Sequence, residues 1–175
     1  MENVILVNEN DEKIGLMEKM QAHKEGRLHR AFSVIIFNKE GDMLIHQRAK
    51  DKYHCGGLWT NACCSHPRDG EATDAAAHRR LKEEMGFDTS LKHIDSFIYK
   101  ASFENGLIEH EYDHIFAGFY DGEIQPNDNE VAHWKYINLV QLKQDIEHHP
   151  ALYTPWFKEI IQHHLKTILN HLQDD

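Results

Sequence analysis

Short apolar runs rich in β-branched and aromatic residues predict a series of strands along the chain. Two pairs of these runs are separated by turn-forming residues, at positions 38–41 and at Asn105 and Gly106, so each pair is expected to form a hairpin. The predicted strands cover residues 31–37, 43–48, 97–103, 107–120 and 131–137.

Three further segments have the spacing of helices. Alanines and a leucine recur at helical steps over residues 74–85, and Gly86 follows as a stop signal. Asn138 is a suitable cap for a short helix that ends near Pro150. Apolar residues at steps of three and four predict one amphipathic helix over residues 156–172. The order of the elements predicts an α/β or α+β sandwich, in which a mixed sheet is flanked by helices.

Composition narrows the class of protein. A chain of 175 residues is expected to form one domain, residues 1–175. Nineteen basic and 29 acidic residues give a net charge of −10, which disfavours a nucleic-acid partner. There is no apolar run of about 18 residues and no signal-like amino terminus, and three cysteines make no disulfide framework. We expect a soluble cytoplasmic protein, a monomer or weak dimer with no membrane partner.

The segment from Ser65 to Phe87 places Glu71, Arg79, Glu83 and Glu84 at fixed offsets. These offsets resemble those of the Nudix box, a loop–helix–loop that binds a diphosphate through a divalent metal. Arg79 and Glu83 are four residues apart and share one helix face, as do Arg80 and Glu84. A carboxylate such as Glu84 is the hard oxygen ligand that Mg²⁺ prefers. An ordinary surface helix with ion pairs is the alternative, but it does not explain the matched positions. These are Glu71, Arg79, Leu81, Glu83, Glu84, Gly86 and Phe87.

Two departures from the box change the expected chemistry. Ser65 stands in place of the opening glycine, and Arg80 stands where hydrolases of this type have a metal-binding glutamate. An arginine does not ligate Mg²⁺ but grips a phosphate bidentately. The altered box is therefore expected to bind a diphosphate without hydrolysing it.

A cysteine–histidine segment and a pair of glutamates form a second candidate site. If residues 59–67 are extended, Cys64 and His66 point to one side and Cys63 to the other. Glu109 and Glu111 share one face of a strand, where two carboxylates need a cation between them or a proton on one of them.

Upstream histidines extend this set of metal-ligating side chains. Because the chain has 15 histidines, an imidazole counts only where spacing or partners support it. Three histidines and two glutamates make a set of five ligands for Zn²⁺ or Mn²⁺, with room for one more ligand. The set is His23, His29, His66, Glu109 and Glu111.

Taken in order, these motifs closely resemble type I isopentenyl-diphosphate isomerases over residues 4–156. The resemblance rests on His23, the segments 28–33, 59–67 and 154–156, the altered box with Arg79 and Arg80, and the Glu109–x–Glu111 pair. It implies a Nudix-type sandwich with extra N-terminal strands and a C-terminal amphipathic helix. It also implies the interconversion of isopentenyl diphosphate and dimethylallyl diphosphate through a tertiary carbocation.

The resemblance also implies the proton-transfer groups. Cys64 and Glu111 would exchange protons with the substrate on opposite faces of the hydrocarbon, and Tyr99 would hydrogen-bond the catalytic glutamate. Nearby cations are expected to lower the pKa of the Cys64 thiol from its usual value of about 8.5. The ring of Trp156 would face the carbocation in place of water.

Binding roles follow from the same resemblance. His23, His29, His66, Glu109 and Glu111 would hold one Mn²⁺ or Zn²⁺. Glu84 and the backbone carbonyl of Cys64 would hold Mg²⁺ on the diphosphate of the prenyl substrate. Arg48, Lys52 and Arg80 would contact the diphosphate, with Lys19 nearby, and Trp59 and Trp156 would surround the hydrocarbon.

Two other functions remain open at this level. A Nudix hydrolase of a nucleoside diphosphate derivative would use the box, but it needs a carboxylate at Arg80 and has no use for Cys64. A metal-storage or metal-sensing protein would use the histidines, but it has no use for the box or for Arg48.

Overall fold

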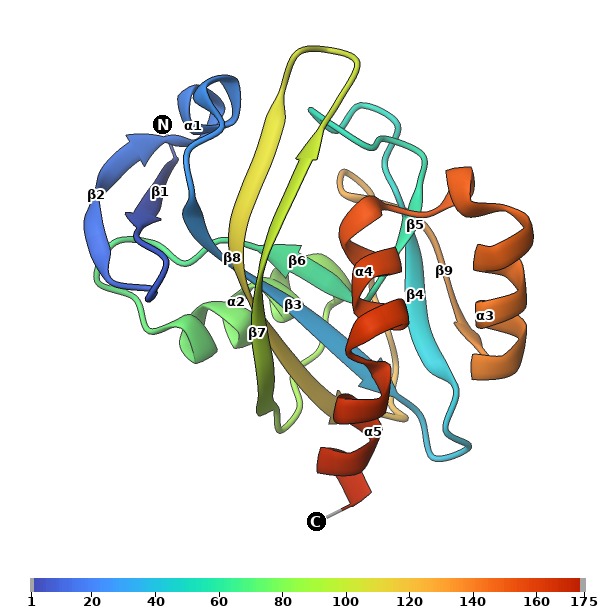
Figure 1. Ribbon diagram of the computed structural model, residues 1–175. Coiled ribbons are helices and arrows are strands. Elements are labelled where there is room, and N and C mark those ends of the chain that lie inside the picture. Colours follow the sequence, from blue (N-terminus) through green and yellow to red (C-terminus); the bar gives the residue numbers. More distant parts are fainter. Residues whose placement is uncertain (1, 174–175) are drawn as a thin grey trace.

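The strand His29–Phe37 (β3) lies at the centre of the fold (Figure 1). The computed structural model describes residues 2–173. β3 pairs in parallel with β8 (Ile108–Phe119) and antiparallel with the short β6 (Cys63–Ser65). Its two ends join β1 (Asn3–Val7) and β4 (Met43–Arg48). This central position brings the start of β3 beside β8, where Glu109 and Glu111 lie.

The remaining strands extend this sheet on both sides. β2 (Lys13–Glu18) pairs with β1, and β7 (Lys92–Ser102) pairs with β8. β5 (Trp59–Thr60) and β9 (Val131–Ile137) both pair with β4. Over residues 2–173 the nine strands form one mixed sheet, as the sequence predicts.

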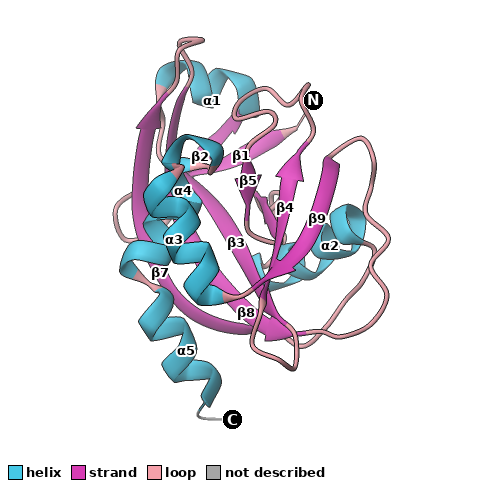
Figure 2. Ribbon diagram, turned by 90° about the vertical axis from the view of Figure 1, so that its right-hand side faces the viewer, coloured by secondary structure: helices cyan, strands magenta, loops and turns pink. Residues whose placement is uncertain are grey.

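Helices cover both faces of the sheet (Figure 2). α2 (Thr73–Met85) packs on one face, and α4 (Pro155–His163) and α5 (Leu165–Gln173) pack on the other. The other helical elements are α1 (Lys19–Glu25), α3 (Leu139–His148) and a 3₁₀ turn over Pro150–Leu152. No helix in the described part of the chain is both long and apolar enough to span a membrane.

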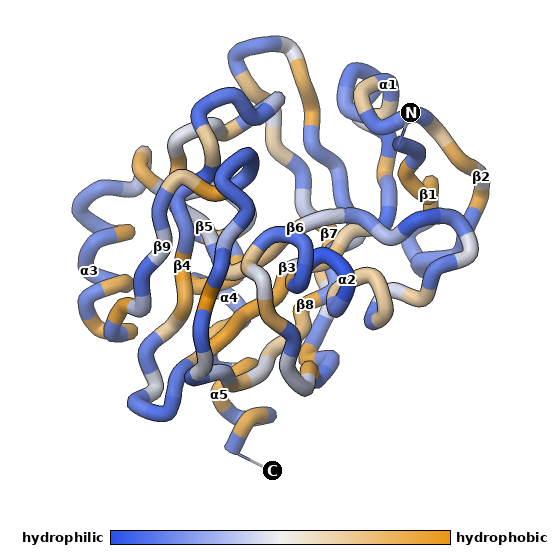
Figure 3. The backbone as a smooth tube through the Cα atoms, turned by 180° about the vertical axis from the view of Figure 1, so that it is seen from behind, coloured by the Kyte–Doolittle hydropathy of each residue, from blue (hydrophilic) through white to orange (hydrophobic). Residues whose placement is uncertain are grey.

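The alternation of side chains along β3 builds a core on each face. Val34 and Ile36 belong to the cluster under α2, whereas Ile35 and Phe37 belong to the cluster under α4 and α5. All four are buried, which is why β3 is a continuous apolar run. Figure 3 shows the hydrophobic stretches of β3 and β4 in the interior and hydrophilic ones in the connecting loops.

Several elements confirm the sequence-based expectations. α2 ends at Gly86, which has φ of 75° and whose added Cβ would lie 2.3 Å from the Gln125 carbonyl oxygen, so both conformation and space require glycine. Asn138 caps α3 by accepting hydrogen bonds from Val140 and Gln141 backbone N–H groups.

Other expectations are corrected. The single helix over residues 156–172 is two helices, because the backbone leaves helical geometry at His164. The His164 Nδ1 atom lies 3.1 Å from a carboxylate oxygen of Asp95, and Asp95 belongs to β7. β7 begins at Lys92 rather than at residue 97, since it pairs with β8 along its whole length. The predicted first hairpin pairs only at Phe37 and Met43 before β4 turns toward β5 and β9.

Candidate active site and metal centre

A cavity of about 110 Å³ lies where the central strands meet the loop between β4 and β5. Polar and charged groups dominate its wall, and Phe32, Tyr53 and Trp156 supply aromatic rings. The predicted site residues that line it are Lys19, Arg48, Lys52, Cys64, His66, Arg80, Glu109, Glu111 and Trp156.

Four buried side chains from four parts of the fold converge beside the cavity. His23 comes from α1, His29 from the start of β3, His66 from the position directly after β6 and Glu111 from β8, and their ligand atoms lie within 4.8 Å of one another. The Glu111 Oε2 atom is 3.1 Å from His66 Nε2 and 3.4 Å from His29 Nε2. The separations are those of neighbouring ligands on one ion, which are about 3 Å apart when each bond is about 2.1 Å.

The histidines are oriented for metal binding. His23 Nδ1 donates to the Lys19 carbonyl at 2.7 Å, and His29 Nδ1 donates to the Arg27 carbonyl at 2.9 Å. With the proton on Nδ1, each Nε2 carries a free lone pair, and neither Nε2 has a hydrogen-bond partner within residues 2–173. A backbone acceptor behind the ring is the usual support of a metal-binding histidine. These donors fit a divalent ion.

The charge state of the carboxylates agrees with this arrangement. Burial alone raises the pKa of Glu111, but the imidazoles of His29 and His66, which lie 3.4 and 3.1 Å from its Oε2 atom, hold that pKa below its usual range. Burial lowers the pKa of His66, so its ring stays neutral and available as a ligand. Glu109 lies on the same face of β8, with its Oε2 atom 3.9 Å from His23 Nε2.

The adjacent cysteines point to opposite sides of β6, as the sequence predicts. Cys63 Sγ donates to Glu84 Oε2 at 2.6 Å on the α2 side. Cys64 faces the cavity, where its Sγ donates to Asn61 Oδ1 and accepts from Trp156 Nε1, both at 3.0 Å. The thiol of Cys64 therefore has a fixed direction.

The expected low pKa of Cys64 is wrong for the protein alone. Burial raises the pKa of the Cys64 thiol well above its usual value, and the positive charge of Arg48 offsets only part of this rise. Cys64 is consequently a neutral thiol, a group that can give a proton before it accepts one.

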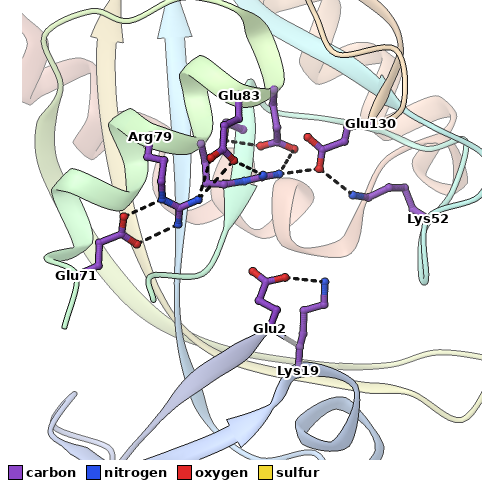
Figure 4. A network of polar contacts seen from close by, with 10 residues as sticks. Glu2, Lys19, Lys52, Glu71, Arg79, Glu83 and Glu130 are labelled. Carbon is purple, nitrogen blue, oxygen red and sulfur yellow. Dashed lines mark hydrogen bonds and ion pairs between the residues drawn. The ribbon is translucent and has the colours of Figure 1, made fainter. Parts of the chain in front are cut away.

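Positive charge gathers on another wall of the cavity, where Lys19, Lys52 and Arg80 each have an acidic partner (Figure 4). Arg80 lies 2.7 Å from Glu130 and 3.4 Å from Glu84. Lys52 Nζ lies 3.6 Å from the same Glu130 oxygen. Burial, with a smaller contribution from Arg48, lowers the pKa of Lys52.

The remaining cations complete this wall. Lys19 Nζ lies 3.3 Å from Glu2 Oε2. Arg48 is 6% exposed, its guanidinium lies 5.2 Å from the centre of the Trp156 ring, and its Nε has no hydrogen-bond partner among the described residues. A buried guanidinium N–H without an acceptor is a binding group for an anion.

Helix α2 carries most of the residues that resemble the Nudix box, and it places Glu84 beside Arg80 of this wall. Arg79 holds Glu71 with two hydrogen bonds of 2.7 and 3.0 Å, which ties the loop before α2 to the helix. Arg79 also reaches Glu83 at 3.3 Å, as their spacing predicts. Burial raises the pKa of Glu84, and the neighbouring Arg80 opposes that rise. Glu84 is thus a buried carboxylate next to the cations, a suitable ligand for Mg²⁺.

Two predicted residues are placed differently from what the sequence suggests. Tyr99 lies directly across from Glu111 in the β7–β8 pairing, but its buried hydroxyl makes no hydrogen bond within residues 2–173, so the expected bond to Glu111 is not formed. Trp59 is not among the described residues that line the cavity, and its ring packs under Lys135 Nζ at 4.8 Å.

Four further residues of the site were not predicted from the sequence. His54 and Glu130 line the cavity, and Asn61 orients Cys64. Asp113 is buried and accepts from the Ser33 hydroxyl at 2.8 Å; burial, then the charge of Glu111, raises its pKa. Of these four only Asp113 has a signal in the sequence, since it continues the two-residue step of Glu109 and Glu111.

Comparison with known proteins gives the family. A family model of the NUDIX domain matches residues 27–157. The chain is 52% identical over 160 residues to isopentenyl-diphosphate Delta-isomerase 2 of Photorhabdus laumondii, covering 91% of this chain and 90% of that relative. It is 49% identical over 161 residues to isopentenyl-diphosphate Delta-isomerase of Burkholderia multivorans, covering 92% of each.

Among solved structures, DR0079 from Deinococcus radiodurans superposes with a TM-score of 0.71 at 19% identity, covering 85% of this chain and 90% of that one. The NUDIX domain of Shewanella oneidensis NrtR superposes with a TM-score of 0.60 at 13% identity, covering 83% and 87%. These two likenesses concern the fold alone. The family model and the close relatives show that the chain belongs to the isopentenyl-diphosphate Delta-isomerases within the NUDIX family.

Proposed function

We propose that this protein interconverts isopentenyl diphosphate and dimethylallyl diphosphate by moving a proton onto one carbon and off another. The observation that carries the proposal is that Cys64 and Glu111 line one cavity together with Trp156 and a wall of cations. This combination suits a substrate with a small hydrocarbon and a diphosphate, and the family relationship supports the same activity.

The proposed reaction balances with two proton-transfer groups. A proton adds to the terminal methylene carbon of isopentenyl diphosphate, which leaves a tertiary carbocation. A proton then leaves the carbon on the other side, and the double bond re-forms there. Cys64 and Glu111 give and accept these protons, and each does both over a round trip because the reaction is reversible.

Other side chains of the cavity hold and shield the substrate. Asn61 and Trp156 fix the direction of the Cys64 thiol through their hydrogen bonds. The aromatic faces of Trp156 and Phe32 exclude water, which would otherwise trap the carbocation as an alcohol. We propose that Tyr99, across the strand from Glu111, turns its free hydroxyl toward that carboxylate when substrate binds. Trp59 has a packing role, with its ring under Lys135 Nζ.

We further propose two metal sites. His23, His29, His66, Glu109 and Glu111 would hold one Mn²⁺ or Zn²⁺, which supplies positive charge beside the catalytic carboxylate. Glu84, with the Cys64 carbonyl, would hold Mg²⁺ on the diphosphate. Lys19, Arg48, Lys52 and Arg80 would bind the diphosphate oxygens by direct contact.

We also propose that the protein works in the cytoplasm on a small molecule. A net charge of −10 suits a small-molecule enzyme rather than a nucleic-acid or membrane partner. All three cysteines are free thiols, which suits the reducing cytoplasm. We propose a one-domain enzyme that acts as a monomer or weak dimer.

An NMR experiment tests the activity directly. Purified protein is incubated with isopentenyl diphosphate and Mg²⁺ in D₂O. We expect dimethylallyl diphosphate that carries deuterium, because the added proton comes from a group that exchanges with solvent. Release of inorganic phosphate in place of isomerisation would instead support the hydrolase alternative and contradict the role given to Arg80.

A further inference from the structure

His54 is a buried histidine beside the metal centre that the five-ligand set does not use. It lies in the loop between β4 and β5, and its side chain is 2% exposed. Neither ring nitrogen has a hydrogen-bond partner in the described part of the chain. A buried imidazole with both nitrogens unsatisfied is rare, because burial removes water as a partner.

The Nε2 atom of His54 is aimed at the acidic part of the site. It lies 2.6 Å from Glu109 Oε2, yet the two groups do not have the alignment of a hydrogen bond. His54, Glu109 and His23 form a group whose ligand atoms lie within 4.8 Å of one another. His23 belongs also to the group with His29, His66 and Glu111, so the two groups share a ligand.

The ring of His54 lies about as far from the ring of His23 as the rings of His29 and His66 do. The His23 and His54 ring centres are 5.7 Å apart, compared with 5.1 Å for His23 and His29 and 6.0 Å for His23 and His66. Aromatic neighbours hold the His54 ring in place, with Phe103 stacked at 5.0 Å and Trp156 edge-on at 5.6 Å. These rings offer no acceptor for an imidazole N–H, which leaves Nε2 directed at the centre.

We infer that His54 is a sixth protein ligand of the metal centre, in the position left open by the five-ligand set. This inference rests on the metal centre of the proposed function. Four imidazoles and two carboxylates favour Zn²⁺ or Co²⁺ over Mn²⁺ more strongly than three imidazoles do. The ion then also fastens the loop that carries Lys52, so metal selectivity and the position of a diphosphate-binding cation share one residue.

The test measures metal binding rather than activity. The metal-free wild type, His54→Gln and the control His149→Gln, an exposed histidine at the end of α3, are each titrated with Zn²⁺, Mn²⁺ and Co²⁺. For His54→Gln we expect the Zn²⁺ affinity to fall by at least about 100-fold, the upper end of what loss of a supporting residue causes. The Mn²⁺ affinity should fall less, and the visible Co²⁺ absorption should shift because oxygen replaces nitrogen. His149→Gln should match the wild type.

Three outcomes would overturn the inference. Equal losses for Zn²⁺ and Mn²⁺ with an unchanged Co²⁺ spectrum would mean that His54 only supports Glu109. Unchanged affinities would mean that it does not act at the site. A wild type that binds none of the three ions would remove the metal centre itself, whereas isomerase activity in D₂O would still test the proposed reaction. If His54→Gln does not fold, X-ray absorption of the zinc-loaded wild type decides, since four imidazole ligands support the inference and three contradict it.

Discussion

Cys63 and Cys64 are neighbours in the chain with different surroundings. Cys64 touches Trp156 and the cavity, whereas Cys63 touches Glu84 and the core under α2. We expect Cys64→Ala to lower kcat by at least about 10²–10⁴-fold, the usual contribution of a proton-transfer group. The fold and the metal content should stay intact. Conversion of isopentenyl diphosphate followed by NMR measures the loss.

Cys63→Ala is the matched control for this prediction. It removes the thiol that donates to Glu84, so we expect a changed Mg²⁺ dependence but a kcat within about tenfold of the wild type. The reverse result, with Cys64→Ala active and Cys63→Ala inactive, would show that the two side chains have been assigned to the wrong faces.

His46 makes the stability of the protein depend on pH. Burial, with help from Arg48, lowers the pKa of His46 to about 3, far below its unfolded value of about 6.5. Between these two pH values the unfolded chain binds a proton that the folded chain does not, so stability falls as the pH drops below about 6.5. From pH 7 to pH 5 this group alone should cost about 2 kcal/mol.

Urea unfolding at the two pH values measures this effect in His46→Gln and in the control His133→Gln, an exposed histidine on β9. The wild type and the control should lose about 2 kcal/mol more than His46→Gln between pH 7 and pH 5. Equal losses in all three proteins would mean that His46 titrates normally.

Some residues of the site could be predicted from the sequence, and others could not. Glu109 and Glu111, like Cys64 and His66, follow from the two-residue period of an extended chain. His54 could not be found, because its approach to Glu109 depends on how a loop folds over a strand far away in the sequence. The raised pKa of Cys64 was missed for a related reason, since a sequence shows which cations are near in the chain but not how much water is excluded.

Among the elements, the junction between β5 and α4 holds Trp156 over Cys64. The hydroxyls of Thr60 and Thr154 are 2.8 Å apart, and Thr154 is fully buried at the start of α4 without capping it. Thr154→Val keeps the shape but removes the bond, so we expect the free energy of unfolding to fall by about 1 kcal/mol. Isomerase activity should fall as well, because Trp156 follows two residues later.

Urea unfolding and the NMR assay measure the two effects. Thr167→Val on α5 is the control, since it makes the same change on a half-buried helix position, and it should alter neither quantity. A Thr154→Val protein as stable and as active as the wild type would show that this hydroxyl pair does not hold the junction.

The elements themselves were predictable to the extent that local signals define them. α2, α3, β4 and β9 have strong caps, stops or apolar runs, and they were placed within one or two residues. The break at His164 could not be seen, because the apolar period continues on both sides of it. The first residues of β7 are polar, and their strand conformation comes from pairing with β8 rather than from their own propensity.

For the whole molecule, the metal centre should be a source of stability. It joins α1, β3, β6 and β8 through buried side chains. An ion present at 100 times its Kd adds about 2.7 kcal/mol, which corresponds to a Tm about 5–10 °C higher for a chain of this length. We therefore expect chelation to lower the Tm by about that amount and added Zn²⁺ to restore it, as followed by calorimetry.

Glu111→Gln gives the matching control. Because this carboxylate would serve both metal binding and proton transfer, the variant should lose activity, and chelation should no longer change its Tm. A wild-type Tm that does not respond to chelation, in protein shown to contain metal, would contradict a stabilising centre. Full activity of Glu111→Gln would contradict the double role.

The parallel pairing of β3 with β8 has a consequence for how the chain folds during synthesis. It brings together residues such as His29 and Glu111, which lie far apart in the sequence, so the central contact of the sheet closes a long loop and forms slowly. At about 5–20 residues per second, the ribosome completes β8 roughly 4–16 seconds after β3. During that interval β3, with Val34, Ile35 and Ile36 at its centre, lacks its main neighbour. The nascent chain therefore displays this apolar strand as an open edge, which exposes the chain to aggregation during that interval.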